Sequence, residues 1–214
     1  MRRVLNAGSG PPSNRHLHPL FTKGEWDEIR LDIDPQASAH LTGSIVDMSA
    51  LVAAQSFDAV WSSHSLEHLY AHEVPRALSE FVRILKPDGF ALISSPDLET
   101  VAALVATRGL DHPAYMSPAG PITPLDMLFG HSASIARGLT FMAHNTGFTC
   151  TSLGNALARA GFAIILVKRD QFDLWALALM QDADKEAIQQ DLKTSGLDMS
   201  DELEAAVVTS VRGT

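Results

Sequence analysis

The fold expected for this chain is decided by one stretch near its start, Val4-Leu5-Asn6-Ala7-Gly8-Ser9-Gly10. A short apolar run ends in a small polar residue, and two glycines then follow one residue apart. This pattern is typical of a buried parallel strand that enters a tight turn at the carboxyl end of an open α/β sheet, where ligands bind. The glycines permit backbone angles and a close ligand approach that a Cβ atom would forbid. The pattern predicts a nucleotide-type pocket, although an ordinary turn after a strand has the same appearance.

The length and composition indicate one α/β domain with a substantial core, because 46% of the 214 residues are hydrophobic and 19% are charged. The formal net charge of −9 repels phosphate backbones, so we expect no nucleic-acid partner. The single cysteine, Cys150, excludes an internal disulfide and fits a reducing compartment. No apolar stretch has the length of a membrane helix or of a signal-peptide core. We therefore expect a cytoplasmic protein without membrane contacts, and we leave a homodimer open as its assembly.

Apolar runs and helical periodicity alternate along the chain after this first stretch. Strands are expected over residues 28–34, 40–46, 57–62 and 90–94, and a closing antiparallel hairpin over 162–168 and 172–180. Helices are expected over residues 65–69, 74–85, 98–107 and 151–160. Pro11 and Pro12 permit only a short, late or irregular helix after Gly10.

The composition changes between residues 110 and 149, where proline, glycine, methionine and histidine are frequent. A segment of this length between a strand and the next helix is usually an insertion with a function. Its apolar side chains need burial, so we expect an ordered lid, without β-sheet, on the ligand side of the sheet. We divide the chain into one domain over residues 1–181, which includes the 110–149 insertion, and acidic C-terminal helices or a tail over residues 182–214.

Four segments within residues 4–97 carry a family resemblance: residues 4–10, Leu31-Asp32-Ile33-Asp34-Pro35, residues 56–69 with their Leu66-Glu67-His68, and Ile84-Leu85-Lys86-Pro87-Asp88-Gly89-Phe90. Together they resemble the class I S-adenosylmethionine-dependent methyltransferases, in the uncharacterised type 11-like subgroup. The resemblance implies a Rossmann-like methyltransferase fold with a seven-stranded, mostly parallel sheet, helices on both faces and a C-terminal antiparallel hairpin. It also implies methyl transfer from S-adenosylmethionine, with S-adenosylhomocysteine as product. The acceptor is not identified, and we expect a small molecule.

The resemblance further implies a set of cofactor-binding residues. They are Asn6, Ala7, Gly8, Ser9, Gly10, Asp32, Ile33, Asp47, Met48, Ser63, His64 and His68. In this set Asp32 would bind the ribose diol with its two acceptor oxygens, while Asp34 is expected to form the turn before the proline. Asp47 would meet the adenine amino group, with Ile33 and Met48 packed on the ring.

Two features depart from the family pattern. Asn6 stands where an acidic residue usually helps to hold the amino group of the cofactor, and an amide can accept a hydrogen bond but carries no charge. Pro11 and Pro12 distort the helix that usually follows the first turn. These departures leave open an alternative in which the protein binds S-adenosylmethionine without catalysis.

Three histidines of the 110–149 insertion are the candidates for a general base or an acceptor contact: His112, His131 and His144. Neutral imidazole is the usual proton acceptor near physiological pH. Because a single histidine is more often structural, the candidates need a test that separates acceptor turnover from cofactor binding.

Residues 64–68 offer a different interpretation, because His64, Glu67 and His68 have the spacing of the inverted zinc-peptidase motif. On a helix, His64 and His68 would share a face, as a metal pair should. A zinc hydrolase is therefore an alternative, but the methyltransferase pattern expects the same motif at this place, and we expect no metal. A dinucleotide-dependent oxidoreductase is another alternative, which Ser13 disfavours because it stands where the third glycine of that fingerprint belongs.

Overall fold

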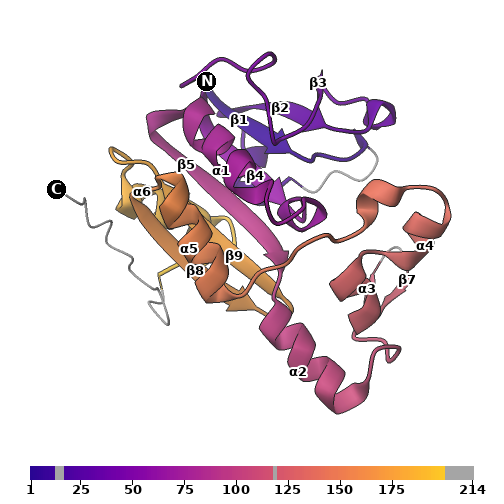
Figure 1. Ribbon diagram of the computed structural model, residues 1–214. Helices are drawn as coiled ribbons and strands as arrows, with labels where there is room; N and C mark the ends of the chain where they lie inside the picture. The colour runs from indigo at the N-terminus through magenta and orange to yellow at the C-terminus, as the bar shows by residue number, and fades with distance from the viewer. Residues whose placement is uncertain (13–16, 118–119, 201–214) are drawn as a thin grey trace.

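The computed structural model describes residues 1–12, 17–117 and 120–200. One seven-stranded sheet in the order β3-β2-β1-β4-β5-β9-β8 forms its centre (Figure 1). The strands are β1 (Arg2–Ala7), β2 (Trp26–Asp32), β3 (Leu41–Thr42), β4 (Phe57–Ser63), β5 (Leu85–Pro96), β8 (Ile164–Asp170) and β9 (Asp173–Leu179). Strand β9 pairs antiparallel with β5 and with β8, whereas the other pairs are parallel. The Rossmann-like fold with a C-terminal hairpin, expected from the sequence, is confirmed.

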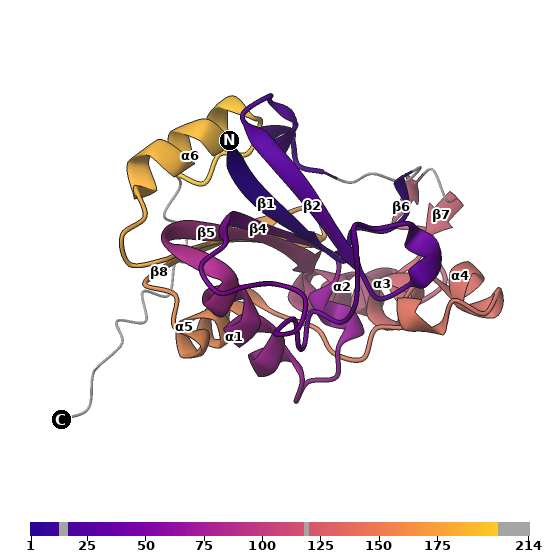
Figure 2. The same cartoon turned by 90° about the horizontal axis from the view of Figure 1, so that it is seen from above.

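Helices cover both faces of this sheet (Figure 2). On one face lie α1 (Val74–Ile84) and α5 (Cys150–Ala160). Helix α1 buries an apolar stripe at helical spacing, made of Val74, Ala77, Leu78, Phe81 and Ile84. The opposite face carries α6 (Lys185–Thr194), whose Leu192 is fully buried in a cluster with Val4 and Phe21. The acidic C-terminal segment therefore contributes to the core through α6, and residues 201–214 lie outside the described part of the chain.

Several elements differ in extent from the expectation. The third strand has only two residues, Leu41–Thr42, instead of seven. Strand β5 begins directly after α1 at Leu85, five residues before the start expected from the sequence at residue 90. A 3-10 turn, η4 (Leu66–His68), replaces the expected helical piece over residues 65–69. Between β1 and β2 the described residues contain a longer 3-10 turn, η2 (Pro19–Thr22), as the prolines predict.

The insertion follows α2 (Leu98–Arg108) and lies beyond the carboxyl end of β5 (Figure 1). Its elements are β6 (Tyr115–Ser117), β7 (Gly120–Ile122), α3 (Pro124–Phe129), α4 (Ser132–Ala136) and η5 (Thr140–Met142). The antiparallel pair of β6 and β7 shows that the expectation of a segment without β-sheet was wrong. Backbone hydrogen bonds from Asn145 and Thr146 to the carbonyl of Glu67 join the end of the insertion to η4. No helix in the described residues is long and apolar enough to cross a membrane.

Candidate functional site

The first turn is fastened to the neighbouring strand through its backbone. The amides of Gly8 and Ser9 both donate to the carbonyl of Leu31, at 2.9 and 3.1 Å. Gly8 and Gly10 have φ angles of 76° and 62°, a region that favours glycine. A Cβ atom on Gly8 would collide with Oγ of Ser65, whereas one on Gly10 would have no atom within 4 Å. The turn therefore requires glycine at position 8 and leaves open space next to Gly10.

Asp32 ends β2 beside this turn, with 8% of its surface exposed. Its Oδ2 accepts a hydrogen bond of 2.8 Å from the amide of Gly10, and its Oδ1 accepts one of 2.9 Å from the amide of Asp34. Asp34 accepts from the amide of Gln36 and caps η3 (Pro35–Ala37), which confirms Asp34 as a turn former. The Asp32 carboxylate is therefore held by two backbone donors and retains lone pairs for a ligand.

Asn6 is almost fully buried, with 3% of its surface exposed, and its Nδ2 donates a hydrogen bond of 2.8 Å to Oε1 of Glu28. An amide that donates through its nitrogen can still accept through its carbonyl oxygen. Glu28, on β2, thus places a carboxylate next to Asn6. In the usual first motif, the residue at position 6 would itself carry this negative charge. The contact between Asn6 and Glu28 could not be predicted from the sequence, because it depends on the register in which β1 pairs with β2. In this register, Val4 lies opposite Glu28.

Asn6, Gly8, Gly10 and Asp32 line a cavity of about 970 Å³. They lie at or just after the carboxyl ends of the parallel strands β1 and β2. Pockets for small ligands usually have 300–1,000 Å³. An aromatic wall of His18, Trp61 and Trp175 lines one part of the cavity. The insertion contributes Tyr115, Ile122, His131, Ser134, Leu139, Phe141 and Met142. Trp175 comes from the C-terminal hairpin, and no local sequence signal marks it as a site residue.

Most of the expected cofactor residues meet in this cavity. The lining includes Asn6, Gly8, Ser9, Gly10, Asp32, Ile33, Ser63, His64 and His68. Ala7 is fully buried and supplies instead its carbonyl oxygen, 3.0 Å from Oγ of Ser65.

Two expected adenine contacts are not part of the cavity lining. Asp47 is exposed and accepts hydrogen bonds from Ser49, and Met48 is fully buried in the core. Ser44 and Ile45 line this part of the cavity. The reason is that β3 ends at residue 42, so the chain leaves the cavity before it reaches Asp47.

A smaller cavity of about 190 Å³ adjoins the first one and shares His64, His68 and His131 with it. His144 of the insertion also lines this smaller cavity. The structure therefore brings two of the three candidate histidines, His131 and His144, to the site. His112 is exposed in the loop after α2 and lines neither cavity.

His64 lies on the shared wall in a left-handed conformation with φ of 48°. Its Nδ1 is 3.2 Å from Oε1 of Glu67, and its Nε2 is 3.6 Å from Oδ2 of Asp173. Burial lowers the pKa of His64, but the two carboxylates outweigh this effect and raise the pKa to about 10. Both ring nitrogens face carboxylates, and residues 66–68 form a 3-10 turn. The structure therefore does not form the helical His64–His68 metal pair on which the zinc-hydrolase alternative depends.

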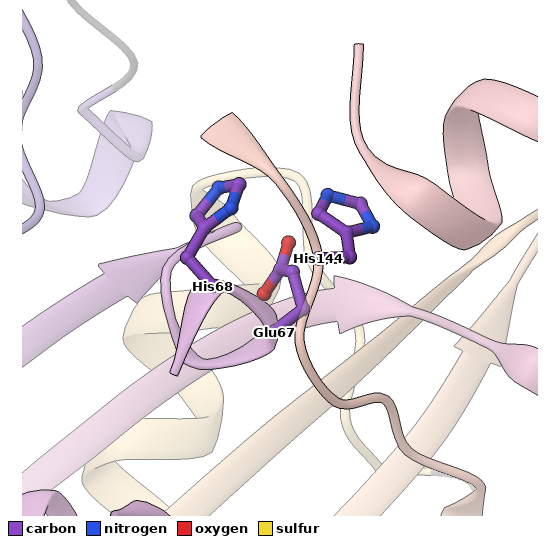
Figure 3. Close-up of side chains that lie close together, drawn as sticks. All are labelled: Glu67, His68 and His144. Atoms are coloured by element: carbon purple, nitrogen blue, oxygen red, sulfur yellow. The ribbon is translucent and has the colours of Figure 1, made fainter. Parts of the chain in front are cut away.

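Glu67, His68 and His144 form a cluster between the core and the smaller cavity (Figure 3). One oxygen of Glu67 and one nitrogen of each imidazole lie within 4.8 Å of one another. The two rings meet edge to face, with centroids 4.9 Å apart. Burial lowers the pKa of His144, which favours its neutral form. Residues of this kind could hold a metal ion.

Comparisons with known proteins agree with this geometry. Residues 5–93 match the methyltransferase domain family. No curated protein sequence matches the chain. A solved S-adenosylmethionine-dependent methyltransferase from Archaeoglobus fulgidus has 14% sequence identity and a TM-score of 0.53, over 83% of this chain and 86% of that chain. One from Mesorhizobium loti has 17% identity and a TM-score of 0.52, over 83% and 90% of the two chains.

A third solved structure is the Burkholderia thailandensis 1,6-didemethyltoxoflavin-N1-methyltransferase, which contains bound 1,6-didemethyltoxoflavin and S-adenosylhomocysteine. It has 16% identity and a TM-score of 0.50, over 85% of this chain and 71% of that chain. Identities this low concern the fold, whereas the family match covers the first turn, Asp32 and the motif around Glu67. Residues 5–93 are therefore similar to the methyltransferase domain family, and the chain has the fold of the class I S-adenosylmethionine-dependent methyltransferases.

Proposed function

We propose that the protein transfers a methyl group from S-adenosylmethionine to a small-molecule acceptor. The observation that carries this proposal is the position of the Gly8–Gly10 turn and the Asp32 carboxylate at one cavity of about 970 Å³. An adenosine-bearing ligand needs a backbone that it can approach closely and acceptor oxygens for its ribose diol. The space next to Gly10 that a Cβ atom would fill supplies the first requirement, and Asp32 supplies the second.

The remaining groups of the cavity fit the other parts of such a ligand. When bound, S-adenosylmethionine supplies a methyl group that its sulfonium activates. Asn6 would accept a hydrogen bond from the amino group, with Glu28 adding negative charge behind it. The His64 cation would attract the carboxylate of the methionine part. Because Glu28 restores the charge that Asn6 lacks, Asn6 does not favour the alternative of binding without catalysis.

The insertion would bind the acceptor. His131 lines both cavities, so it lies where an acceptor could meet the methyl group. Positioning supplies most of the rate of such a transfer, and a base is needed only for a protonated nucleophile. We assign His131 to acceptor contact and exclude His112 from this role, because His112 is exposed outside both cavities. The single cysteine supports a reducing, cytoplasmic setting for this activity.

Parallel thermal-shift measurements with S-adenosylmethionine, S-adenosylhomocysteine and NAD test the proposal. A ligand at one hundred times its Kd adds about 2.7 kcal/mol of stability, which raises the Tm of a domain of this size by roughly 5–10 °C. We expect this increase with the first two ligands and none with NAD. A shift with NAD alone would overturn the proposal in favour of an oxidoreductase, and calorimetry would confirm the result.

A further inference from the structure

The cluster of Glu67, His68 and His144 has a chemistry that cofactor binding does not use. We propose that these three side chains bind one divalent transition-metal ion of the zinc type, at the wall of the smaller cavity. The metal site itself depends only on these three side chains, whereas the role of the ion toward the acceptor rests on the proposed methyl transfer. The sequence pattern pairs His68 with His64, whereas the fold pairs it with His144, 76 positions further along the chain.

The first reason for a metal site is the burial of the Glu67 carboxylate. Only 1% of Glu67 is exposed, and neither of its carboxylate oxygens has a hydrogen-bond partner among the described residues. Its contact with His64 is an ion pair at 3.2 Å through one oxygen. Buried carboxylates are normally hydrogen-bonded or coordinate metals, because their desolvation is costly. Figure 3 shows this carboxylate between the rings of His68 and His144.

The second reason for a metal site is the pattern of hydrogen bonds made by His68 and His144. Nδ1 of His68 lies 3.1 Å from the carbonyl oxygen of Ala143, and Nδ1 of His144 lies 2.9 Å from that of Met127. A carbonyl oxygen can only accept, so each Nδ1 carries a proton, and in the neutral ring the lone pair is then on Nε2. Histidines that bind metals typically donate their second N–H to a backbone carbonyl or a carboxylate in this way. For the neutral rings, these two hydrogen bonds select the tautomer that can bind a metal ion through Nε2.

The composition of the cluster indicates which ion would bind. Two imidazole nitrogens and one carboxylate oxygen match zinc sites that keep one position open, with bonds of about 2.0–2.2 Å. Such bonds place the ligand atoms roughly 3–4 Å apart, so a cluster within 4.8 Å closes through small side-chain rotations. His68 and His144 both line the smaller cavity, so the open position would face the acceptor. We therefore infer an acceptor whose reacting hydroxyl or amine can ligate the ion.

Titration of the full-length, chelator-stripped protein with Zn²⁺ in a calorimeter tests this inference, with Co²⁺ absorption as a second measurement of coordination. We expect one equivalent to bind. Glu67→Gln and His144→Ala should each weaken binding by at least about tenfold, and Co²⁺ should lose its absorption bands in both. His72→Ala is the matched control, because His72 is exposed on the adjacent segment and lies outside the cluster. It should bind Zn²⁺ like the wild type.

Three outcomes of these titrations would contradict the proposed metal site. Absence of one-equivalent binding in the wild type would show that the His64 ion pair alone accounts for the buried Glu67. Unchanged affinity in both cluster variants would place the metal elsewhere. Calorimetry with S-adenosylhomocysteine on every variant checks that the fold is intact. Cofactor binding without Zn²⁺ binding would refute the metal site alone, and the converse would refute the methyltransferase proposal alone.

Discussion

Two walls of the large cavity are built by different means. The cradle wall (residues 4–10 and 31–34) is held by backbone hydrogen bonds between two adjacent parallel strands, such as those from Gly8 and Ser9 to Leu31. The lid wall (residues 110–149) is held by contacts between distant segments, such as that between the His68 ring and the carbonyl of Ala143. The cradle wall therefore depends on the backbone geometry of two paired strands, whereas the lid wall depends on backbone and side-chain contacts between segments that are far apart in the sequence.

Gly8→Ala should have the largest effect on stability and cofactor binding, because it changes the backbone geometry of the cradle wall. An alanine at φ of 76° carries about 1–2 kcal/mol of strain, and its Cβ atom would collide with Ser65. We expect the free energy of unfolding to fall by roughly 2–4 kcal/mol, together with a loss of S-adenosylhomocysteine binding. Urea denaturation and calorimetry measure the two effects.

Gly10→Ala is the matched control, because its φ of 62° imposes similar strain but its Cβ atom would meet nothing within 4 Å. It should lose roughly half as much stability. A Ser65→Gly change in the Gly8→Ala background should recover part of the loss, since it removes the colliding atoms. If Gly8→Ala were as stable as the wild type, the cradle wall would not depend on its backbone.

Asp32→Ala should have the second-largest effect. The variant loses charge-assisted hydrogen bonds to the ribose diol, worth roughly 1.5–3 kcal/mol, so the affinity for S-adenosylmethionine should fall about tenfold to a hundredfold. Asp34→Ala is the control, because Asp34 caps η3 with its carboxylate. It should weaken binding much less, as calorimetry can show. The reverse order would assign the ribose contact to Asp34.

The two walls also differ in how far the sequence predicts them. Residues 4–10 and Asp32 could be placed because strand, turn and acid follow one another at short spacing, and their local rules decide the result. The structure does not place Asp47 and Met48 in the cavity lining, because β3 pairs with β2 over only two residues and nothing in the sequence marks that end. Local reasoning also could not foresee the approach of His144 to Glu67, because it depends on how the insertion folds back onto η4.

The pH dependence of stability probes His18, on the aromatic wall next to the cradle. Its ring contacts both Trp61 and Trp175, with centroid distances of 5.7 and 5.8 Å, and the two indole rings stack on each other. Its Nδ1 accepts a hydrogen bond from the amide of Leu20. Burial lowers the pKa of His18 from 6.5 to about 4. Between these values the unfolded chain binds a proton that the folded chain does not bind, so stability falls as the pH decreases from 6.5 to 4.

The contribution of His18 should be about 1–2 kcal/mol, below the full linkage value, because part of the ring faces the open cavity. Urea denaturation at several pH values measures it. His18→Asn is the control, since asparagine can still accept from Leu20 and does not titrate in this range. Its stability should depend less on pH between 6.5 and 4. An equal dependence in both proteins would assign the effect to another group.

His131→Ala should have the smallest effect on the cofactor and thereby separates the two walls most directly. His131 belongs to the lid wall, and its Nδ1 lies 2.8 Å from Oγ of Ser134 in the same turn. Because the cradle wall makes its own contacts, the Kd for S-adenosylhomocysteine should change less than about threefold, or 0.7 kcal/mol. The kcat for an acceptor found by screening should fall, because His131 lines both cavities. His112→Ala, an exposed change in the same insertion, should alter neither quantity. A loss of cofactor affinity as large as that of Asp32→Ala would mean that the lid wall holds the cofactor as well, and the division between the two walls would fail.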